Sequence, residues 1–324
     1  MRLIFTINEP GTFFHFLDSI SSWDLHTRSS VKKYYKKKFG LSKKDYEILD
    51  KYIQIRRKHS WEKLDSDFYP SRNFKDLKIK LKKRLSKKDY SSLERVMDYF
   101  YPNLHKVFNE WKGHLLVRKK GLENQAKRHN LKKLFSEIVG FYESKNYPRK
   151  VFVHLVVSPS FHSSGGGANI SPEEHITIEP RKLKENNQRD IIHDISIVAH
   201  EILHLIEHNA NKRKWNQFKK ISKKKKLNTE ILRESIADTL VPDGDLALKY
   251  GLIDKITIFN FNKLRKISQY RKDNPSKYYR KSRQKLSAMI YPLTKKQLEE
   301  EKSLFEGNYI KNCISKYLEM RERT

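Results

Sequence analysis

The chain has 324 residues, which corresponds to about two domains. Its 69 Lys and Arg residues outnumber 38 Asp and Glu residues, for a formal net charge of +31. Hydrophobic residues make up 37% and aromatic residues 12%, which is enough for a folded core and excludes a wholly disordered chain. The single cysteine, Cys313, excludes a disulfide framework and any zinc site that needs several cysteines.

Neither a membrane span nor a secretory signal is apparent. The longest stretch without Asp, Glu, Lys or Arg is residues 151–172, and its second half consists largely of Ser, Gly and His. Apolar residues 3–5 form a run that is too short for the apolar part of a signal peptide. We therefore expect a cytoplasmic protein that does not bind membranes.

The N-terminal part of the chain favours helices. Residues 1–10 predict one short strand that ends at Pro10, and in residues 13–142 apolar side chains recur every three or four positions with lysines between them. The hexapeptide Leu-Ser-Lys-Lys-Asp-Tyr occurs at residues 41–46 and again at 85–90. Each copy resembles a helix start, with a serine N-cap and an aspartate three positions later. We expect residues 1–145 to form a mostly helical region.

Strand-like segments follow residue 146. Residues 151–157 are rich in β-branched and aromatic side chains and predict a buried strand. A polar, glycine-rich loop is expected at 163–167, and the alternating pattern of residues 174–179 predicts a second strand that ends at Pro180.

The C-terminal part predicts helices again. Residues 188–209 are apolar over much of the helix circumference, which is typical of a buried helix. A polar linker is expected at residues 210–227, a helix at 228–241, and further helices within 245–324. The pattern as a whole predicts an α+β fold, with residues 146–324 forming a second domain that has a helical C-terminal part.

The buried helix carries the sequence His200-Glu201-Ile202-Leu203-His204. Residues four positions apart on an α-helix differ by about 400° in rotation and roughly 6 Å in rise, so both imidazoles project from one face. One Zn²⁺ ion can accept a nitrogen atom from each of them. Glu201 lies beside the pair, offset around the helix, where it can reach a metal-bound water.

A catalytic zinc needs a third protein ligand, and Glu234 is the best candidate. His208 continues the line of His204, but three successive turns of one straight helix cannot converge on one ion. Glu234 and Asp238 are four positions apart on the helix predicted at 228–241. One carboxylate of this pair can bind the metal while the other accepts the N–H of a ligand histidine.

These motifs resemble those of gluzincin-type zinc metallopeptidases, which carry HExxH on one helix and Glu-x-x-x-Asp on a following helix. The resemblance covers about residues 150–241. It implies one Zn²⁺ per chain held by His200, His204 and Glu234, with Glu201 as general base and Asp238 supporting a ligand. It also implies a zincin-like catalytic domain within residues 146–324.

The same resemblance implies two further features. An edge strand would align an extended peptide, and either residues 165–170 or residues 174–179 can provide it. A downstream Tyr or His would stabilise the oxyanion, and the candidates are Tyr270, Tyr278, Tyr279 and Tyr291.

The resemblance therefore predicts a metallopeptidase that hydrolyses peptide bonds with a metal-activated water. The segment from Lys212 to Lys226 contains nine basic residues and no acidic ones, together with Trp215 and Phe218. Basic residues interleaved with aromatic ones occur in nucleic-acid-binding surfaces. The positive charge also suits an acidic peptide or protein substrate. The alternative function is a basic helical protein that binds nucleic acid and has no catalytic metal. A metal-binding protein without peptidase activity, or a hydrolase of another bond, also fits the motif.

Overall fold

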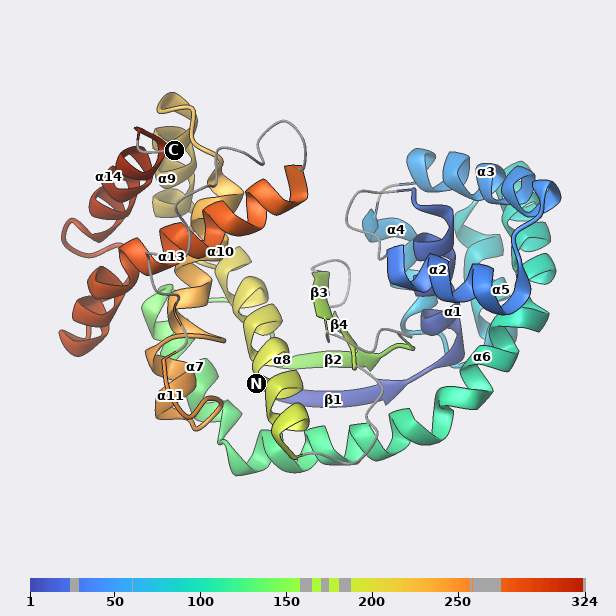
Figure 1. Ribbon diagram of the computed structural model, residues 1–324, viewed down its shortest axis with the longest axis horizontal. Coiled ribbons are helices and arrows are strands. Elements are labelled where there is room, and N and C mark those ends of the chain that lie inside the picture. The colour runs from blue at the N-terminus through green and yellow to red at the C-terminus, as the bar shows by residue number, and fades with distance from the viewer. Residues whose placement is uncertain are drawn as a thin grey trace. The chain divides into compact units, whose positions relative to one another are not determined.

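The computed structural model describes residues 1–23, 29–59, 61–157, 165–169, 175–180, 188–256, 258 and 275–322 (Figure 1). The described part is mostly helical with one small sheet, so the expected α+β class is confirmed. The chain divides into two compact units that interleave along the sequence. The sheet unit contains residues 2–124 and 150–194, and the C-terminal unit contains Met1 with residues 125–149 and 195–324.

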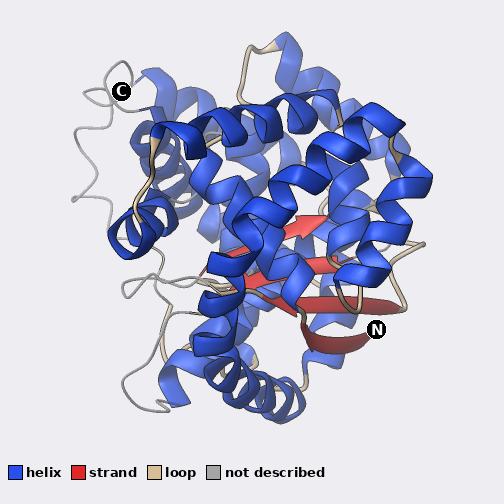
Figure 2. Ribbon diagram, turned by 90° about the vertical axis from the view of Figure 1, so that its right-hand side faces the viewer, coloured by secondary structure: helices blue, strands red, loops and turns tan. Residues whose placement is uncertain are grey.

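The sheet unit contains a four-stranded sheet in the order β1-β2-β4-β3, and Figure 2 shows these strands side by side. Strands β1 (Arg2–Ile7), β2 (Lys150–Leu155) and β4 (His175–Glu179) are mutually parallel, and β3 (Gly165–Asn169) runs antiparallel to β4. The three strands predicted from the sequence are therefore confirmed, but the first ends at Ile7 and not at Pro10, which lies in the first turn of the following helix.

Strand β3 corrects one expectation, because its glycines were predicted to form a loop. Gly165, Gly166 and Gly167 pair with residues of β4 through the backbone. Sheet pairing uses backbone N–H and C=O groups, so a glycine run can form a strand when a neighbouring strand such as β4 provides partners. Since β3 lies at one end of the strand order and β4 lies inside it, β3 is the edge strand of the two candidates.

Six helices of the N-terminal region accompany the sheet, which confirms the helical series expected there. Their bounds are α1 (Glu9–Ser21), α2 (Ser29–Phe39), α3 (Lys43–Lys58), α4 (Trp61–Phe68), α5 (Phe74–Arg84) and α6 (Lys87–Arg128), whose last four residues belong to the C-terminal unit. A buried ion pair joins α1 to α3: Arg56 Nε lies 3.0 Å from Asp18 Oδ1. The Arg56 guanidinium also stacks over the Phe14 ring at 4.5 Å.

The repeated hexapeptide does mark two helix starts. Ser42 and Asp45 form a full capping box at the start of α3. At the start of α6, Ser86 Oγ accepts the N–H of Asp89 at 3.1 Å, while the Asp89 carboxylate binds Lys58 at 2.6 Å. The second copy therefore uses its aspartate to join two helices.

The C-terminal unit is helical throughout its described part. It contains α7 (Leu131–Phe141), residues 195–208 of α8 (Gln188–His208), α9 (Lys212–Lys224), α10 (Thr229–Leu240), α11 (Asp245–Lys249), α13 (Pro275–Glu299) and α14 (Tyr309–Glu322). Helices α10 and α13 pack along each other. A hydrogen bond of 2.9 Å between the Thr239 and Thr294 hydroxyls joins them.

Helix α9 corrects the expectation of a polar linker. Its N-cap, Asn211, accepts the N–H of Lys214 at 3.3 Å. Trp215 and Phe218 are three positions apart and are both buried, so they give this lysine-rich segment one apolar face. Two aromatic side chains at helical spacing are enough to dock a helix, and the many lysines around them obscured this pattern in the sequence. No helix in the described part of the chain has both the length and the apolar character that a bilayer span requires.

Candidate metal centre

Helix α8 positions the two histidines of the motif side by side. The side chains of His200 and His204 are 9% and 12% exposed, and their rings meet edge to face with centroids 4.7 Å apart. Their Nε2 atoms lie 3.1 Å from each other. The expected one-turn spacing is therefore confirmed, and both Nε2 atoms point to one place.

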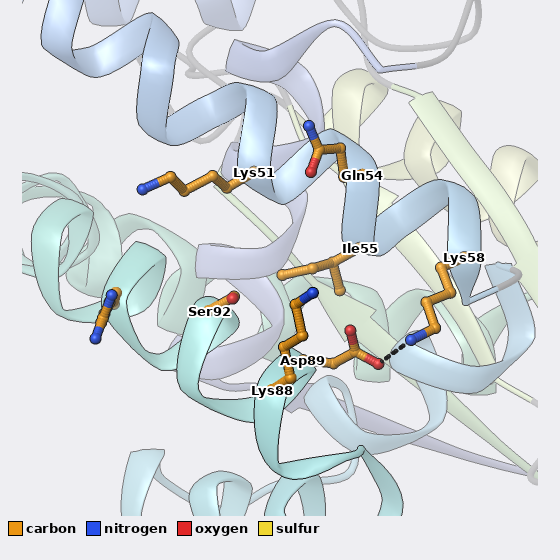
Figure 3. A pocket seen from close by; sticks show the side chains of 8 residues that line it. Lys51, Gln54, Ile55, Lys58, Lys88, Asp89 and Ser92 are labelled. Carbon is orange, nitrogen blue, oxygen red and sulfur yellow. Dashed lines mark hydrogen bonds and ion pairs between the residues drawn. The ribbon is translucent and has the colours of Figure 1, made fainter.

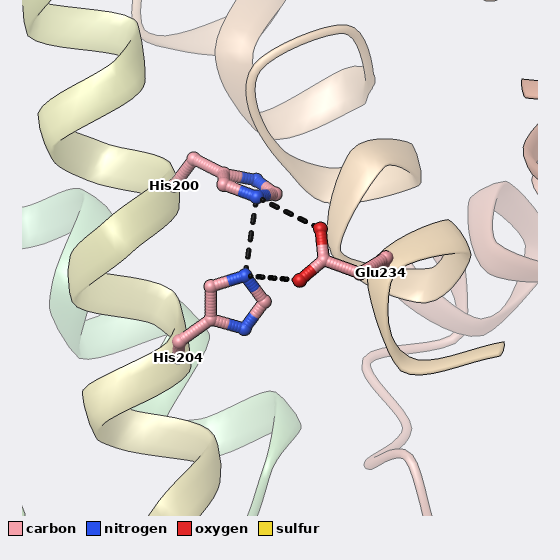
Figure 4. Close-up of side chains that lie close together, drawn as sticks. All are labelled: His200, His204 and Glu234. Atoms are coloured by element: carbon pink, nitrogen blue, oxygen red, sulfur yellow. Dashed lines mark hydrogen bonds and ion pairs between the residues drawn. The ribbon is translucent and has the colours of Figure 1, made fainter. Parts of the chain in front are cut away.

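Glu234 reaches the same place from α10, as Figure 4 shows. Its Oε1 lies 3.0 Å from His204 Nε2, and its Oε2 lies 3.4 Å from His200 Nε2. Asn228 starts α10 by accepting the N–H groups of Glu230 and Ile231 at 3.0 and 3.2 Å. Because Glu234 follows this cap by six residues, its position on the helix is fixed by a local signal.

The outward nitrogen of each imidazole also has a partner. His200 Nδ1 lies 3.0 Å from the carbonyl oxygen of Val241, and His204 Nδ1 lies 3.2 Å from Glu207 Oε2. Both partners are acceptors, so each Nδ1 can donate a proton outward, and a metal ion bound at the centre would then meet the lone pair of each Nε2. Arg233 Nε holds Glu207 Oε1 at 2.8 Å. The outward hydrogen bonds of the two imidazoles are of the kind that orient metal-binding histidines.

The three donors fit a divalent metal ion. Donor atoms around a tetrahedral zinc, at bond lengths of about 2.0–2.1 Å, lie about 3.3 Å apart. The two Nε2 atoms lie 3.1 Å apart, and each faces a different oxygen of Glu234, His204 at 3.0 Å and His200 at 3.4 Å, which is close to this value. Two imidazoles and one carboxylate form a common donor set for catalytic zinc, and other transition metals also accept it. All three side chains belong to the C-terminal unit.

The electrostatics of the cluster favour bound positive charge. Burial alone would raise the pKa of Glu234, but hydrogen bonds with His200 and His204 hold it well below its usual range. Burial likewise would lower the pKa of His204, but its bonds with Glu207 and Glu234 raise it to about 10. Two lone pairs and a carboxylate that converge in a buried place attract a cation, whether a proton or a metal ion.

Glu201 is the free carboxylate of the motif. Its side chain is partly exposed, and it makes no hydrogen bond or ion pair with any residue that the structure describes. Burial raises its pKa, while the charges of His200 and His204 act in the opposite direction. Such a side chain is available to accept a proton from a neighbouring group.

Asp238 differs from the expectation that it would accept the N–H of a ligand histidine. Val241 and Glu207 fill that role, while Asp238 binds Arg283, with Arg283 Nε 2.6 Å from Asp238 Oδ2. Arg283 Nη1 in turn lies 2.6 Å from Glu234 Oε2. Asp238 therefore supports Glu234 through an arginine of α13.

Sequence reasoning did not single out Arg283. The basic stretch from Lys272 to Lys285 contains it, but no spacing distinguishes it from the neighbouring Lys and Arg residues. The packing of α13 on α10 brings it to Glu234. The same holds for the Val241 carbonyl, because a backbone acceptor leaves no mark in a sequence.

The four tyrosines considered as oxyanion stabilisers differ in their surroundings. The Tyr291 hydroxyl donates a hydrogen bond to Asp245 Oδ1 at 2.8 Å. Tyr279 is the one coupled to the centre, since burial and the nearby charge of Glu234 raise its pKa. Tyr270 lies outside the described residues.

Other acidic and histidine residues near the motif do not join the cluster. His208 is exposed at the end of α8, and Asp194 pairs with Arg118 at 3.2 Å within the sheet unit. Among the described residues, His200, His204 and Glu234 are the group whose ligand atoms all lie within 4.8 Å of one another.

The basic segment from Lys212 to Lys226 does not offer its aromatic side chains to a ligand. Trp215 and Phe218 are only 6% and 2% exposed and stack on each other with ring centroids 4.7 Å apart. Base stacking needs exposed rings. Binding of nucleic acid by this segment therefore has only the charge of its lysines in its favour.

Comparisons with known proteins give no relative. No protein-family model, no curated protein and no solved structure matches the chain.

Proposed function

We propose that this protein is a zinc-dependent metallopeptidase with one Zn²⁺ ion per chain, held by His200, His204 and Glu234. The observation that carries the proposal is that the two Nε2 atoms, 3.1 Å apart, converge on the two carboxylate oxygens of Glu234 at 3.0 and 3.4 Å, together with acceptors opposite both outward Nδ1 atoms. Structural histidines need no such convergence of three acceptor atoms. A metal site does, and it also needs the outer hydrogen bonds that fix each tautomer.

Glu201 is the general base of the proposed reaction. When bound, Zn²⁺ supplies Lewis-acid chemistry, which acidifies water and polarises a carbonyl group. Glu201 accepts the proton of the attacking water and delivers it to the leaving amine. Its place between two ligand histidines and its lack of a partner among the described residues support this role.

The proposed substrate is a peptide or protein, and the proposed domain is zincin-like. In support, a small sheet and a buried helix carrying the motif are both present. Tyr279 is the proposed stabiliser of the oxyanion, because its electrostatic coupling to Glu234 sets it apart from Tyr291.

Metal content and peptide cleavage, measured on the same preparations, test the proposal. The wild-type protein should hold about one equivalent of zinc and cleave members of a peptide library. Glu201→Gln should keep the metal and lose cleavage, since the amide binds water but cannot take its proton. His204→Ala should lose both, because two donors remain where at least three are needed.

His208→Ala is the matched control, since it removes an exposed histidine one turn further along the same helix. It should keep both zinc and activity. Wild-type protein that takes up less than a tenth of an equivalent of any transition metal would overturn the metal site. Full zinc without cleavage by any preparation would leave the site in place and refute the peptidase.

A further inference from the structure

A second candidate site lies in the sheet unit, between helices α3 and α6. A pocket of about 410 Å³ is lined there by Lys51, Gln54, Ile55 and Lys58 of α3 and by Lys88, Asp89, Ser92 and Arg95 of α6. Figure 3 shows the α3 wall with Lys51 and Lys58 and the α6 wall with Lys88 and Ser92. None of these residues belongs to the metal centre.

The pocket carries unbalanced positive charge. Its one acid, Asp89, is occupied by Lys58 at 2.6 Å and His59 at 3.2 Å, and the bond with Lys58 lowers the pKa of Asp89 to about 2. Lys51, Lys88 and Arg95 make no ion pair or hydrogen bond with any residue that the structure describes. Three cations therefore face one pocket without a counter-charge.

The spacing of these charges suits a ligand with several anionic groups. Lys51 and Lys58 are seven positions apart on α3, and Lys88 and Arg95 are seven positions apart on α6. Seven residues of α-helix are two turns, or about 10 Å, so α6 presents two unpaired cations about that far apart, and α3 adds Lys51 from the other wall. A single carboxylate would meet only one end of such a pocket, whereas two or three linked phosphates reach along it.

The remaining lining residues are also suited to phosphate. The hydroxyl of Ser92 and the amide of Gln54 can donate hydrogen bonds to phosphate oxygens. Ile55 is only 5% exposed and contributes an apolar part of the wall. Neutral donors placed between cations are typical of sites that hold phosphate groups by charge-assisted hydrogen bonds.

We propose that this pocket binds a compact anion that carries two or three linked phosphate groups. Lys51, Lys88 and Arg95 contact the phosphates, and Ser92 and Gln54 donate to the remaining oxygens. The ligand chemistry is the same for an inorganic polyphosphate and for the phosphate chain of a nucleoside triphosphate, so both are tested.

Calorimetric titration of the full-length protein with tripolyphosphate and, separately, with ATP measures this binding. Both probes should bind the wild type, with affinity falling as salt is added. The double variant Lys51→Gln/Lys88→Gln should bind at least about tenfold more weakly, because two of the charge-assisted contacts are lost. Equal affinities for the two probes would indicate that the phosphates alone are recognised, and tighter binding of ATP would indicate the nucleotide as the source.

The control is the double variant Lys43→Gln/Lys112→Gln, which removes the same charge from exposed positions of the same two helices outside the pocket. It should bind like the wild type. An equal loss in both double variants would overturn the proposal in favour of diffuse attraction by a basic surface. Absence of binding to wild type at millimolar tripolyphosphate and low salt would also overturn it. A single-stranded oligonucleotide that binds the pocket more tightly than either probe would refute a compact ligand.

Discussion

Glu234 has two kinds of partner, and this makes it the residue on which the metal centre depends most. Its Oε1 faces His204, while its Oε2 is also held by Arg283 at 2.6 Å. Asp238 keeps Arg283 in place through two hydrogen bonds, at 2.6 and 2.5 Å, and Ser287 adds a third contact with Asp238 at 3.2 Å. A chain of charges thus fixes the carboxylate before any ion binds.

Arg283→Gln is expected to weaken zinc binding by about 10- to 100-fold, the usual effect of losing a partner that orients a ligand. The reason is that Glu234 loses the bond that fixes its carboxylate. A competition titration with a chromogenic chelator measures the affinity. Tighter binding in Arg283→Gln would contradict this role and show that the arginine competes with the metal for the carboxylate.

Asp238→Asn provides the matched test of the same chain. By itself it should weaken zinc binding, because it releases Arg283. In the Arg283→Gln background it should add little, since the residue through which it acts is already gone. Independent, additive effects of the two substitutions would show that Asp238 acts by another route.

The meeting of His200, His204 and Glu234 was predictable from the sequence, whereas the residues that support them were not. His200 and His204 share one helix, so their spacing decides their geometry. Glu234 follows from the need for a third ligand and from the neighbouring Asp238. Arg283 meets Glu234 only through the packing of α13 on α10, and a contact between two helices distant in the sequence cannot be predicted from local patterns.

At the scale of elements, β2 carries a buried histidine whose pKa is strongly lowered. His154 is 3% exposed, its Nδ1 lies 2.7 Å from the Thr6 hydroxyl of β1, and its ring packs against His175 of β4. Burial, with a smaller contribution from His175, lowers the pKa of His154 to about 3. This histidine therefore stays neutral in the folded protein over a pH range in which an exposed one becomes charged.

The free energy of unfolding should consequently fall as the pH falls. Below the unfolded pKa of about 6.5, the unfolded chain binds a proton at this position and the folded chain does not. Between pH 7 and pH 5 the effect of this one group is about 2 kcal/mol. Urea unfolding at several pH values should show that His154→Gln loses about this much less stability over that interval than the wild type.

His208→Gln is the control for this experiment, because that histidine is exposed. Its stability should depend on pH as that of the wild type does. Parallel pH profiles for wild type and His154→Gln would show that His154 is protonated equally in the folded and unfolded chains.

The elements that the sequence predicted correctly are those with a strong local pattern. Strands β1, β2 and β4 and helices α8 and α10 follow from runs of apolar residues or from caps such as Asn228. The two misassigned segments, β3 and α9, have compositions that suggest loops. Strand β3 is formed by pairing with β4, and α9 by burial of Trp215 and Phe218. In both cases tertiary contacts override the local preference.

At the scale of the whole molecule, each of the two units is built from segments that are not continuous in the sequence. The chain passes from one to the other near residues 124, 149 and 194, and two of these crossings lie inside helices α6 and α8. The sequence predicted instead one boundary at residue 145, because its change of composition there is the clearest along the chain. Parallel pairing of β1 with β2 joins segments separated by almost half the chain, and composition gives no indication of it.

Because α8 crosses between the units while the metal ligands lie in one of them, bound zinc should stabilise the molecule unevenly. Zinc at 1,000 times its dissociation constant stabilises the folded state by about 4 kcal/mol. It would join residues 195–208 of α8 to α10 beside the ion pair between Glu207 and Arg233, and so raise the free energy of local opening there. Amide hydrogen exchange should therefore slow most in these two helices when zinc is added, and least in β1, β2 and β4.

Hydrogen exchange followed by mass spectrometry, with zinc and with a chelator, measures this difference. In His204→Ala the addition of zinc should leave exchange unchanged, whereas His208→Ala should respond like the wild type. Since the proposed ion would contact both α8 and α10, slowing that is absent from α10 would mean that Glu234 is not a ligand. Equal slowing in His204→Ala would mean that zinc binds elsewhere on the chain.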